Sequence, residues 1–181
     1  MKNPLIVFLL LALFATNATA QSGKKKHLKW ETIEEVEKSI RKNPKLVLID
    51  VYTDWCGWCK KMDKTTFSDP EIVKYIKKKF YPVKFNAESK RDIQFKGHTF
   101  KYIPNGNRGV NELAVALLNK RLSYPSVVYL DQELDIITVV PGYWKPEEYL
   151  NILKFFGEGL YKQKGINIED YLKNPDKYLK N

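Results

Sequence analysis

Two cysteines separated by two residues are the part of this sequence best suited to chemistry. Cys56 and Cys59 are the only cysteines of the 181-residue chain, and they enclose Gly57 and Trp58. A thiolate is the reacting species in disulfide exchange, so one thiol can attack a substrate and the other can then resolve the mixed disulfide. The spacing therefore predicts a redox pair that carries out thiol–disulfide exchange on other proteins.

The position of the pair predicts which cysteine attacks first. Residues 46–52 form a short apolar, β-rich run typical of a strand buried on both faces, and no turn signal separates the pair from Lys60 and Lys61. The pair thus lies where a strand ends and a helix begins. Unpaired N–H groups and the helix dipole favour a thiolate at that point. We expect Cys56 to be the exposed nucleophile and Cys59 the resolving thiol.

Three other uses of the pair remain as alternatives. A structural disulfide would gain little, because closing so short a loop removes little entropy from the unfolded chain. A zinc site usually needs four ligands, and His27 and His98 lack finger-like spacing. Covalent haem attachment needs a histidine where Lys60 stands. We expect neither a metal nor a cofactor, and we interpret both histidines as surface residues.

The first residues resemble a secretory signal. Lys2 precedes an apolar run over residues 5–15, and small residues follow up to Ala20. We predict cleavage near Ala20, which would leave a periplasmic or secreted protein. A membrane anchor is the alternative, although an apolar run of about 11 residues is short of the about 20 that span a bilayer.

Composition fits one basic domain. The apolar content is 44% and the net charge is +10, so the chain can build a core and carries an excess of lysine. The lysines are spread over residues 24–26, 77–79 and the C-terminal tail without a recognition motif, so we do not expect nucleic-acid binding. A solvated basic surface that favours acidic partners or a membrane face is the ordinary explanation. We expect a monomer.

The remaining sequence predicts a single α/β domain over residues 21–181. Residues 87–108 are the least regular part, and we predict a small inserted hairpin there; residues 157–181 form a polar extension. The periodicity and the turn signals predict helices at 32–42, from 68–71 onward, at 111–118, at 145–156 and at 168–173. They predict strands at 46–52, 81–86, 126–130 and 134–140. The last two strands are expected to form an antiparallel hairpin.

The stretch around the cysteines resembles a known family. Residues 48–60, which read LIDVYTDWCGWCK, resemble the strand and active loop of thioredoxins, especially those of extracytoplasmic bacterial thioredoxin-like proteins. The matching elements span about residues 46–156, and their order is more specific than any one of them. The resemblance implies a thioredoxin fold, with a central mixed sheet flanked by helices and a small insertion before the helix that precedes the cis-proline strand.

The resemblance also implies a charged pair behind the cysteines. Asp50 falls where thioredoxins keep a buried carboxylate, and residues 83–86 resemble the strand whose lysine, here Lys84, pairs with it. A desolvated carboxylate has a raised pKa, so Asp50 is a candidate general base for the Cys59 proton. The alternative is a core acid that is merely paired with Lys84.

Other matched positions are implied to bind substrate. Residues 124–126 resemble the segment whose proline is cis and faces the disulfide, and an ordinary trans proline that opens a strand is the alternative. Two departures stand out: a tryptophan replaces the proline usual within the cysteine pair, and residues 87–108 have no counterpart in thioredoxin. The expected substrate-binding residues are Trp55, Gly57, Trp58, Tyr124, Pro125 and Gly142, although packing alone would explain Trp55 equally well.

The resulting hypothesis is an exported enzyme that reduces protein disulfides and is itself re-reduced by a membrane-bound or other redox partner. The reducing direction follows from the resemblance of the Asp50 and Lys84 pair to that of reducing thioredoxins. A disulfide oxidase or isomerase is the alternative enzyme. A non-enzymatic binding module that uses the groove, or the segment 95–102, is the alternative outside catalysis.

Overall fold

A four-stranded mixed sheet organises residues 27–179, the part of the chain that the computed structural model describes. The strands run in the order β2–β1–β7–β8; β1 pairs parallel with β2 and antiparallel with β7, and β8 pairs antiparallel with β7. Their bounds are Leu46–Tyr52 (β1), Phe80–Asn86 (β2), Ser126–Leu130 (β7) and Ile136–Pro141 (β8). The predicted signal at residues 1–20 and its cleavage point lie outside the described residues.

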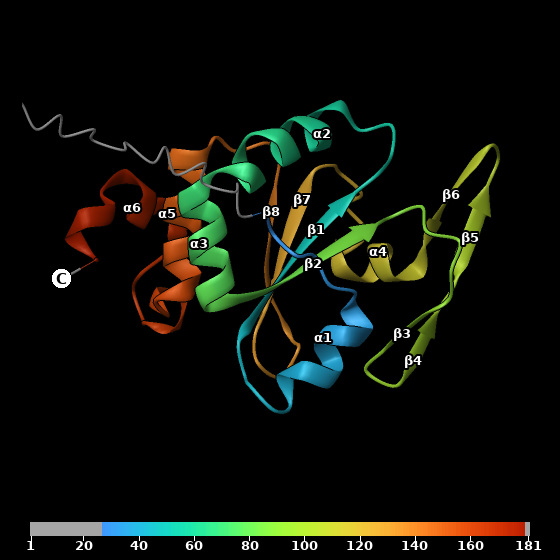
Figure 1. Ribbon diagram of the computed structural model, residues 1–181, viewed down its shortest axis with the longest axis horizontal. Helices are drawn as coiled ribbons and strands as arrows, with labels where there is room; N and C mark the ends of the chain where they lie inside the picture. Colours follow the sequence, from blue (N-terminus) through green and yellow to red (C-terminus); the bar gives the residue numbers. More distant parts are fainter. Residues whose placement is uncertain (1–26, 180–181) are drawn as a thin grey trace, which may run out of the picture.

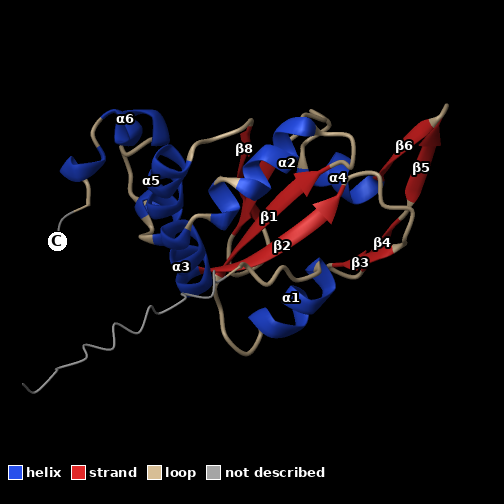
Figure 2. Ribbon diagram, turned by 45° about the horizontal axis from the view of Figure 1, so that its top comes forward, coloured by secondary structure: helices blue, strands red, loops and turns tan. Residues whose placement is uncertain are grey.

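Helices cover both faces of this sheet (Figures 1 and 2). Side chains alternate along β1, so Leu46 and Leu48 pack with α3 and α5, while Val47 and Ile49 pack with α1 and α4. This two-sided burial confirms the prediction for residues 46–52. The helices are α1 (Ile33–Ile40), α2 (Gly57–Lys64), α3 (Pro70–Lys79), α4 (Glu112–Leu117), α5 (Pro146–Gly157) and α6 (Ile168–Lys173), with 3-10 turns at Thr66–Ser68, Leu160–Lys162 and Pro175–Lys177.

Local capping explains why the predicted helices begin where they do. Thr32 and Glu35 form the expected capping box at α1, and Asp69 caps α3 ahead of a proline in its first turn. The predicted helix at 168–173 is present as α6, and its Tyr171 is fully buried next to Phe155 of α5. The C-terminal extension therefore packs onto the domain.

The insertion is larger than predicted. It holds two antiparallel hairpins, β3 (Ile93–Phe95) with β4 (His98–Phe100) and β5 (Tyr102–Asn105) with β6 (Arg108–Asn111). The predicted hairpin is present as β3–β4, and the β5–β6 hairpin was missed; two separate turns are present, with positive φ at Lys96 and Gly97 in the first and at Gly106 in the second. The β5–β6 hairpin projects at the end of the molecule opposite α6 (Figure 1).

Candidate active site

The cysteine pair lies at the first turn of α2, directly after β1. Cys56 is the N-cap of the helix, and its backbone N–H donates to the carbonyl of Thr53 at 3.1 Å. Cys56 and Cys59 form a disulfide with a Cα–Cα distance of 5.3 Å, and the Sγ of Cys56 accepts the backbone N–H of Cys59 at 3.1 Å. The predicted strand-to-helix position of the pair is confirmed.

The expected exposure of Cys56 is corrected by the structure. In the disulfide form Cys56 is only 5% exposed and Cys59 is 3% exposed. The Cys56 sulfur is turned back onto the helix, because it is bonded to Cys59 and also accepts an N–H from its first turn. Neither cysteine belongs to the two hydrophobic clusters of the described residues, and each follows an exposed tryptophan, Trp55 before Cys56 and Trp58 before Cys59.

A buried ion pair lies on the neighbouring strands, as the resemblance implied. Asp50 of β1 and Lys84 of β2 are register partners, and the Nζ of Lys84 donates to Asp50 Oδ2 at 2.9 Å. Lys84 also pairs with Asp63 of α2. We call Asp50, Lys84 and Asp63 the polar triad. The sequence analysis missed Asp63, although it follows Cys59 by four residues and therefore shares its helix face.

Aromatic rings hold the lysine of the polar triad in place. The Nζ of Lys84 lies 5.0 Å from the ring centroids of both Trp30 and Tyr52, a distance at which a cation is attracted to a ring face. Burial alone would lower the pKa of Lys84, but the charges of Asp50 and Asp63 outweigh it and raise the pKa. Lys84 therefore stays protonated across the physiological range.

In Asp50 burial, and not the neighbouring charge, determines the direction of the pKa shift. Its side chain is 1% exposed, and this burial raises the pKa to about 6; Lys84 opposes the rise and the negative charge of Asp63 adds to it. Asp50 Oδ1 has no hydrogen-bond partner among the described residues. The carboxyl group can therefore change its protonation state near neutral pH, and one of its oxygens is free to accept a proton.

Trp55 forms one side of the rim around the disulfide. It is 51% exposed, and its Nε1 donates to Glu88 Oε1 at 2.9 Å. Tyr124 meets the indole edge-to-face at 6.0 Å, and the guanidinium of Arg108 lies over the ring at 4.7 Å. We call these four residues the Trp55 cluster. Arg108 comes from β6, so the insertion contributes to the rim, which the sequence alone did not reveal.

Trp58 forms a second group of the rim. It is 57% exposed and lies 5.4 Å from the ring of Tyr143, in a tilted arrangement. The Nζ of Lys61 lies over both rings, 4.7 Å from Trp58 and 5.1 Å from Tyr143. We call these three residues the Trp58 cluster. Of the two lysines that the sequence placed near the pair, Lys61 therefore has a defined position against an aromatic surface.

A backbone hydrogen bond joins two of the remaining predicted groove residues, Pro125 and Gly142. The Tyr124–Pro125 peptide bond is cis, so the alternative of an ordinary trans proline is wrong. The N–H of Gly142 donates to the carbonyl of Pro125 at 2.8 Å, and Gly142 has a φ of +90°, which favours glycine. Gly57 is exposed, and a Cβ there would meet nothing within 4 Å, so packing does not require glycine at that position.

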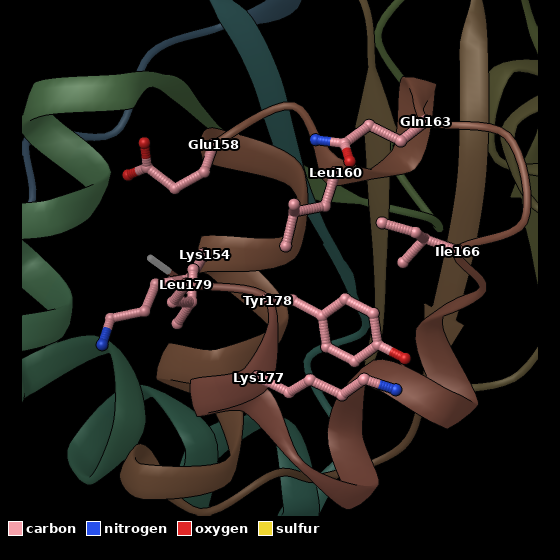
Figure 3. Close-up of a pocket in the computed structure, with 8 residues that line it drawn as sticks. All are labelled: Lys154, Glu158, Leu160, Gln163, Ile166, Lys177, Tyr178 and Leu179. Carbon is pink, nitrogen blue, oxygen red and sulfur yellow. The ribbon is translucent and has the colours of Figure 1, made fainter. Parts of the chain in front are cut away.

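A separate cavity lies far from this chemistry. It has a volume of about 670 Å³, and it is lined by residues of α5 and of the C-terminal extension, including Glu158, Leu160 and Tyr178 (Figure 3). No residue of the disulfide, the polar triad or the rim lines it. The cavity therefore plays no part in the site described above.

The fold and the site together define a class of protein: a mixed sheet between helices that presents a disulfide at a helix N-terminus beside a cis-proline. The family model of the thioredoxin-like domain matches residues 33–157. The chain belongs to the thioredoxin-like domain family, and the Cys56–Cys59 disulfide lies within the matched residues.

Solved structures confirm the fold. A thioredoxin-fold protein from Helicobacter pylori superimposes with a TM-score of 0.56 at 22% identity, covering 72% of this chain and 81% of that chain. A putative disulphide-isomerase from Bacteroides thetaiotaomicron gives a TM-score of 0.53 at 19% identity, covering 75% of this chain and 98% of that chain. At these identities the likeness concerns the fold alone.

Curated relatives match a shorter stretch. The thiol:disulfide interchange protein DsbD of Escherichia coli K12 is 35% identical over 67 residues, which is 35% of this chain and 12% of that protein. DsbD of Haemophilus influenzae PittEE is 37% identical over 57 residues, 31% of this chain and 10% of that protein. The chain thus spans about a tenth of the length of these relatives. Within residues 27–179, no helix has the length and apolar character needed to cross a membrane.

Proposed function

We propose that this protein is an exported reductase of protein disulfides that works through the Cys56 and Cys59 pair. The observation that carries the proposal is the Cys56 sulfur at the N-cap of α2, where it receives the backbone N–H of Cys59. The same hydrogen bond and the helix dipole would stabilise a Cys56 thiolate once the disulfide is reduced. A stabilised thiolate is the attacking group that disulfide reduction needs.

The proposed cycle starts from the dithiol form. The Cys56 thiolate attacks one sulfur of a substrate disulfide, whose S–S bond breaks, and the departing sulfur leaves as a thiolate that takes up a proton. Cys59 then loses its proton and attacks the Cys56 sulfur, which releases the second substrate thiol. The substrate gains two electrons and two protons, and the protein ends as the Cys56–Cys59 disulfide.

Asp50 is the proposed acceptor of the Cys59 proton. Lys84 bonds to both Asp50 and Asp63, and Asp63 lies one turn beyond Cys59 on the same face of α2. Lys84 therefore links Asp50 to the helix face that carries Cys59. Its free Oδ1 and its pKa of about 6 suit a group that takes a proton and returns it near neutral pH.

The reducing direction requires an electron donor. After each turnover two electrons must return to the Cys56–Cys59 disulfide, and we assign this task to a membrane-bound or other dithiol partner. The secretory signal predicted at residues 1–20 supports a place outside the cytosol. Two curated relatives are named as thiol:disulfide interchange proteins. Their names also support protein thiols and disulfides as the class of substrate.

Two variants test the proposal. Cys56→Ser is expected to abolish insulin-disulfide reduction in a dithiothreitol-coupled assay, because it removes the nucleophile. Cys59→Ser is expected to trap natural substrates as mixed disulfides on Cys56, which mass spectrometry can name, and the Cys56→Ser/Cys59→Ser protein is the control that traps nothing. Undiminished function of Cys56→Ser in cells would contradict the proposal and favour a binding module.

A redox titration of the Cys56 and Cys59 couple tests the direction. A reductase is expected to have a potential below that of the glutathione pool, since electrons must flow from it to its substrates. A potential near the glutathione value or above would instead favour a disulfide oxidase or isomerase.

A further inference from the structure

We propose that the rim selects substrate disulfides whose cysteine is flanked by acidic residues, with Arg108 and Lys61 as the two carboxylate-binding groups. This inference rests on the proposed function and names the class of substrate for the same site. The occupant is an extended peptide segment that carries Asp or Glu beside the cysteine under attack.

Arg108 is positioned to bind a carboxylate. Its guanidinium lies over the Trp55 ring at 4.7 Å, and none of the hydrogen bonds and ion pairs of the described residues uses its side-chain donors. A guanidinium that stacks on an aromatic face keeps its edge free, and that edge presents paired N–H donors that match a carboxylate. The Trp55 ring therefore holds in place a cation whose donors point away from it.

Lys61 provides a matching cation in the Trp58 cluster. Its Nζ lies within 5.1 Å of the ring centroids of both Trp58 and Tyr143, and none of the described ion pairs involves it. A lysine held by two rings loses less freedom when it binds an anion than a lysine that extends into solvent. Each of the two tryptophans next to the cysteines, Trp55 and Trp58, therefore has one cation over its ring.

The acidic neighbours of the rim do not neutralise these cations in the structure. Glu88 is the carboxylate of the Trp55 cluster, but it accepts from the Trp55 Nε1 at 2.9 Å, and no ion pair joins it to Arg108. Asp54 accepts from Asn86 at 3.0 Å. Neither carboxylate forms an ion pair with Arg108 or Lys61 among the described residues, so the side-chain donors of both cations remain open to a ligand.

The charge of the whole chain supports the same occupant. A net charge of +10 attracts acidic partners over several ångströms and repels basic ones.

The test uses short disulfide peptides whose residues on both sides of the attacked cysteine are Glu, Gln or Lys. The reduced full-length protein reacts with each peptide, and each rate constant is divided by that of the same peptide with dithiothreitol, which corrects for intrinsic reactivity. We expect the Glu peptide to react about three- to fivefold faster than the Gln peptide at low salt, the range for one or two exposed charge contacts, and the Lys peptide to react more slowly. The preference should fall as salt rises.

Variants assign the preference to the rim. Arg108→Gln and Lys61→Gln are each expected to reduce the Glu-to-Gln rate ratio, and Arg108→Lys to retain only part of it because the planar fork is lost. Lys164→Gln removes an equal charge from the C-terminal extension and should leave the ratio unchanged. A ratio near one in the wild type, or an unchanged ratio in both rim variants, would overturn the inference.

A second measurement separates docking from exchange. Peptides with serine in place of cysteine are titrated into the oxidised protein, and the Arg108 Nε–H and Trp55 Nε1–H signals are followed by NMR. We expect shifts with the Glu peptide and not with the Lys peptide. Absence of exchange with every disulfide peptide would refute the proposed function, whereas exchange without these shifts and without a Glu preference would refute the acidic specificity alone.

Discussion

Two layers of charge surround the disulfide, and they differ in burial. The polar triad lies behind the pair, with Asp50 1% exposed and a lysine enclosed by two carboxylates and two rings. The Trp55 and Trp58 clusters lie in front of it, with both tryptophans about half exposed and their cations at the surface. The same interaction types, ion pair and cation–π, are therefore present in two different dielectric environments.

This difference in burial separates the residues proposed to carry out the redox chemistry from those proposed to select the substrate. A buried charge without its partner costs several kcal/mol, whereas an exposed cation–π contact contributes about 0.5–1 kcal/mol. The polar triad is thus tightly constrained, and it can shift the pKa of a group that moves protons. Substitution of the exposed rim cations costs little free energy of unfolding, so substrate preference can vary there while the redox chemistry is preserved.

Removal of the shared cation should produce the largest effect on stability. Lys84→Met leaves Asp50 buried without a cation, so we expect a loss of about 3–5 kcal/mol in the free energy of unfolding at pH 8, measured by urea titration. Lys79→Met is the matched control, since Lys79 pairs with Glu158 at the surface at 3.0 Å and should cost under about 1 kcal/mol. Equal losses in the two variants would contradict the contrast between the layers.

The sequence allows much of this arrangement to be predicted, because local signals determine it. The buried strand, the capping box of α1 and the strand-to-helix position of the cysteines all follow from short patterns, and the resemblance supplied Asp50, Lys84 and the cis-proline. Asp63 was missed because a carboxylate on an amphipathic helix is ordinarily a solvated residue. Its role appears only when β2 brings Lys84 beneath α2.

The rim was less predictable for a different physical reason. Arg108 is more than 50 residues from Trp55, and its position depends on the register and turn of a hairpin whose existence the sequence did not indicate. The expected exposure of Cys56 was wrong because its sulfur is bonded to Cys59 and accepts a backbone N–H from the first turn of α2.

Asp50→Asn should remove a pH dependence of stability. The folded pKa of about 6 lies above the ordinary aspartate pKa of 3.8, so between these values the native state holds a proton that the unfolded state has released. Stability is therefore lost as pH rises from about 4 to about 6, by about 2–3 kcal/mol for a shift of this size. Chemical denaturation at pH 4 and pH 7 should show this component in the wild type and not in Asp50→Asn. The same change in both proteins would contradict it.

The same variant should slow the resolving step. An amide cannot accept the proton of Cys59, so we expect the rate of release of the second substrate thiol to fall by about ten- to a hundredfold. This range lies at or below the lower end of the usual contribution of a general base. Stopped-flow measurement of the pre-formed mixed disulfide isolates this step. First attack by Cys56 is the internal control and should change much less. Equal slowing of both steps would indicate a structural effect.

Asp63→Asn should have a smaller effect, because this carboxylate is partly exposed. Its charge raises the pKa of Asp50, so its removal should lower that pKa and shift the pH profile of the resolving step to lower pH. The carboxyl carbon signal of Asp50 gives an independent measurement by NMR. Asp54→Asn is the control, since Asp54 is exposed and bonds to Asn86. An upward shift in Asp63→Asn would contradict the coupling.

The smallest effects on stability are expected at the rim, and they should differ between its two clusters. Arg108→Gln leaves Trp55 held by Glu88 and Tyr124, whereas Lys61→Gln removes a cation that two rings share. We therefore expect each variant to lose less than about 1 kcal/mol in the free energy of unfolding, and Lys61→Gln to lose more than Arg108→Gln. Nitrogen-15 relaxation of the tryptophan Nε1–H groups should show greater mobility of Trp58 in Lys61→Gln than of Trp55 in Arg108→Gln. The reverse order would mean that Arg108 is the main support of its indole.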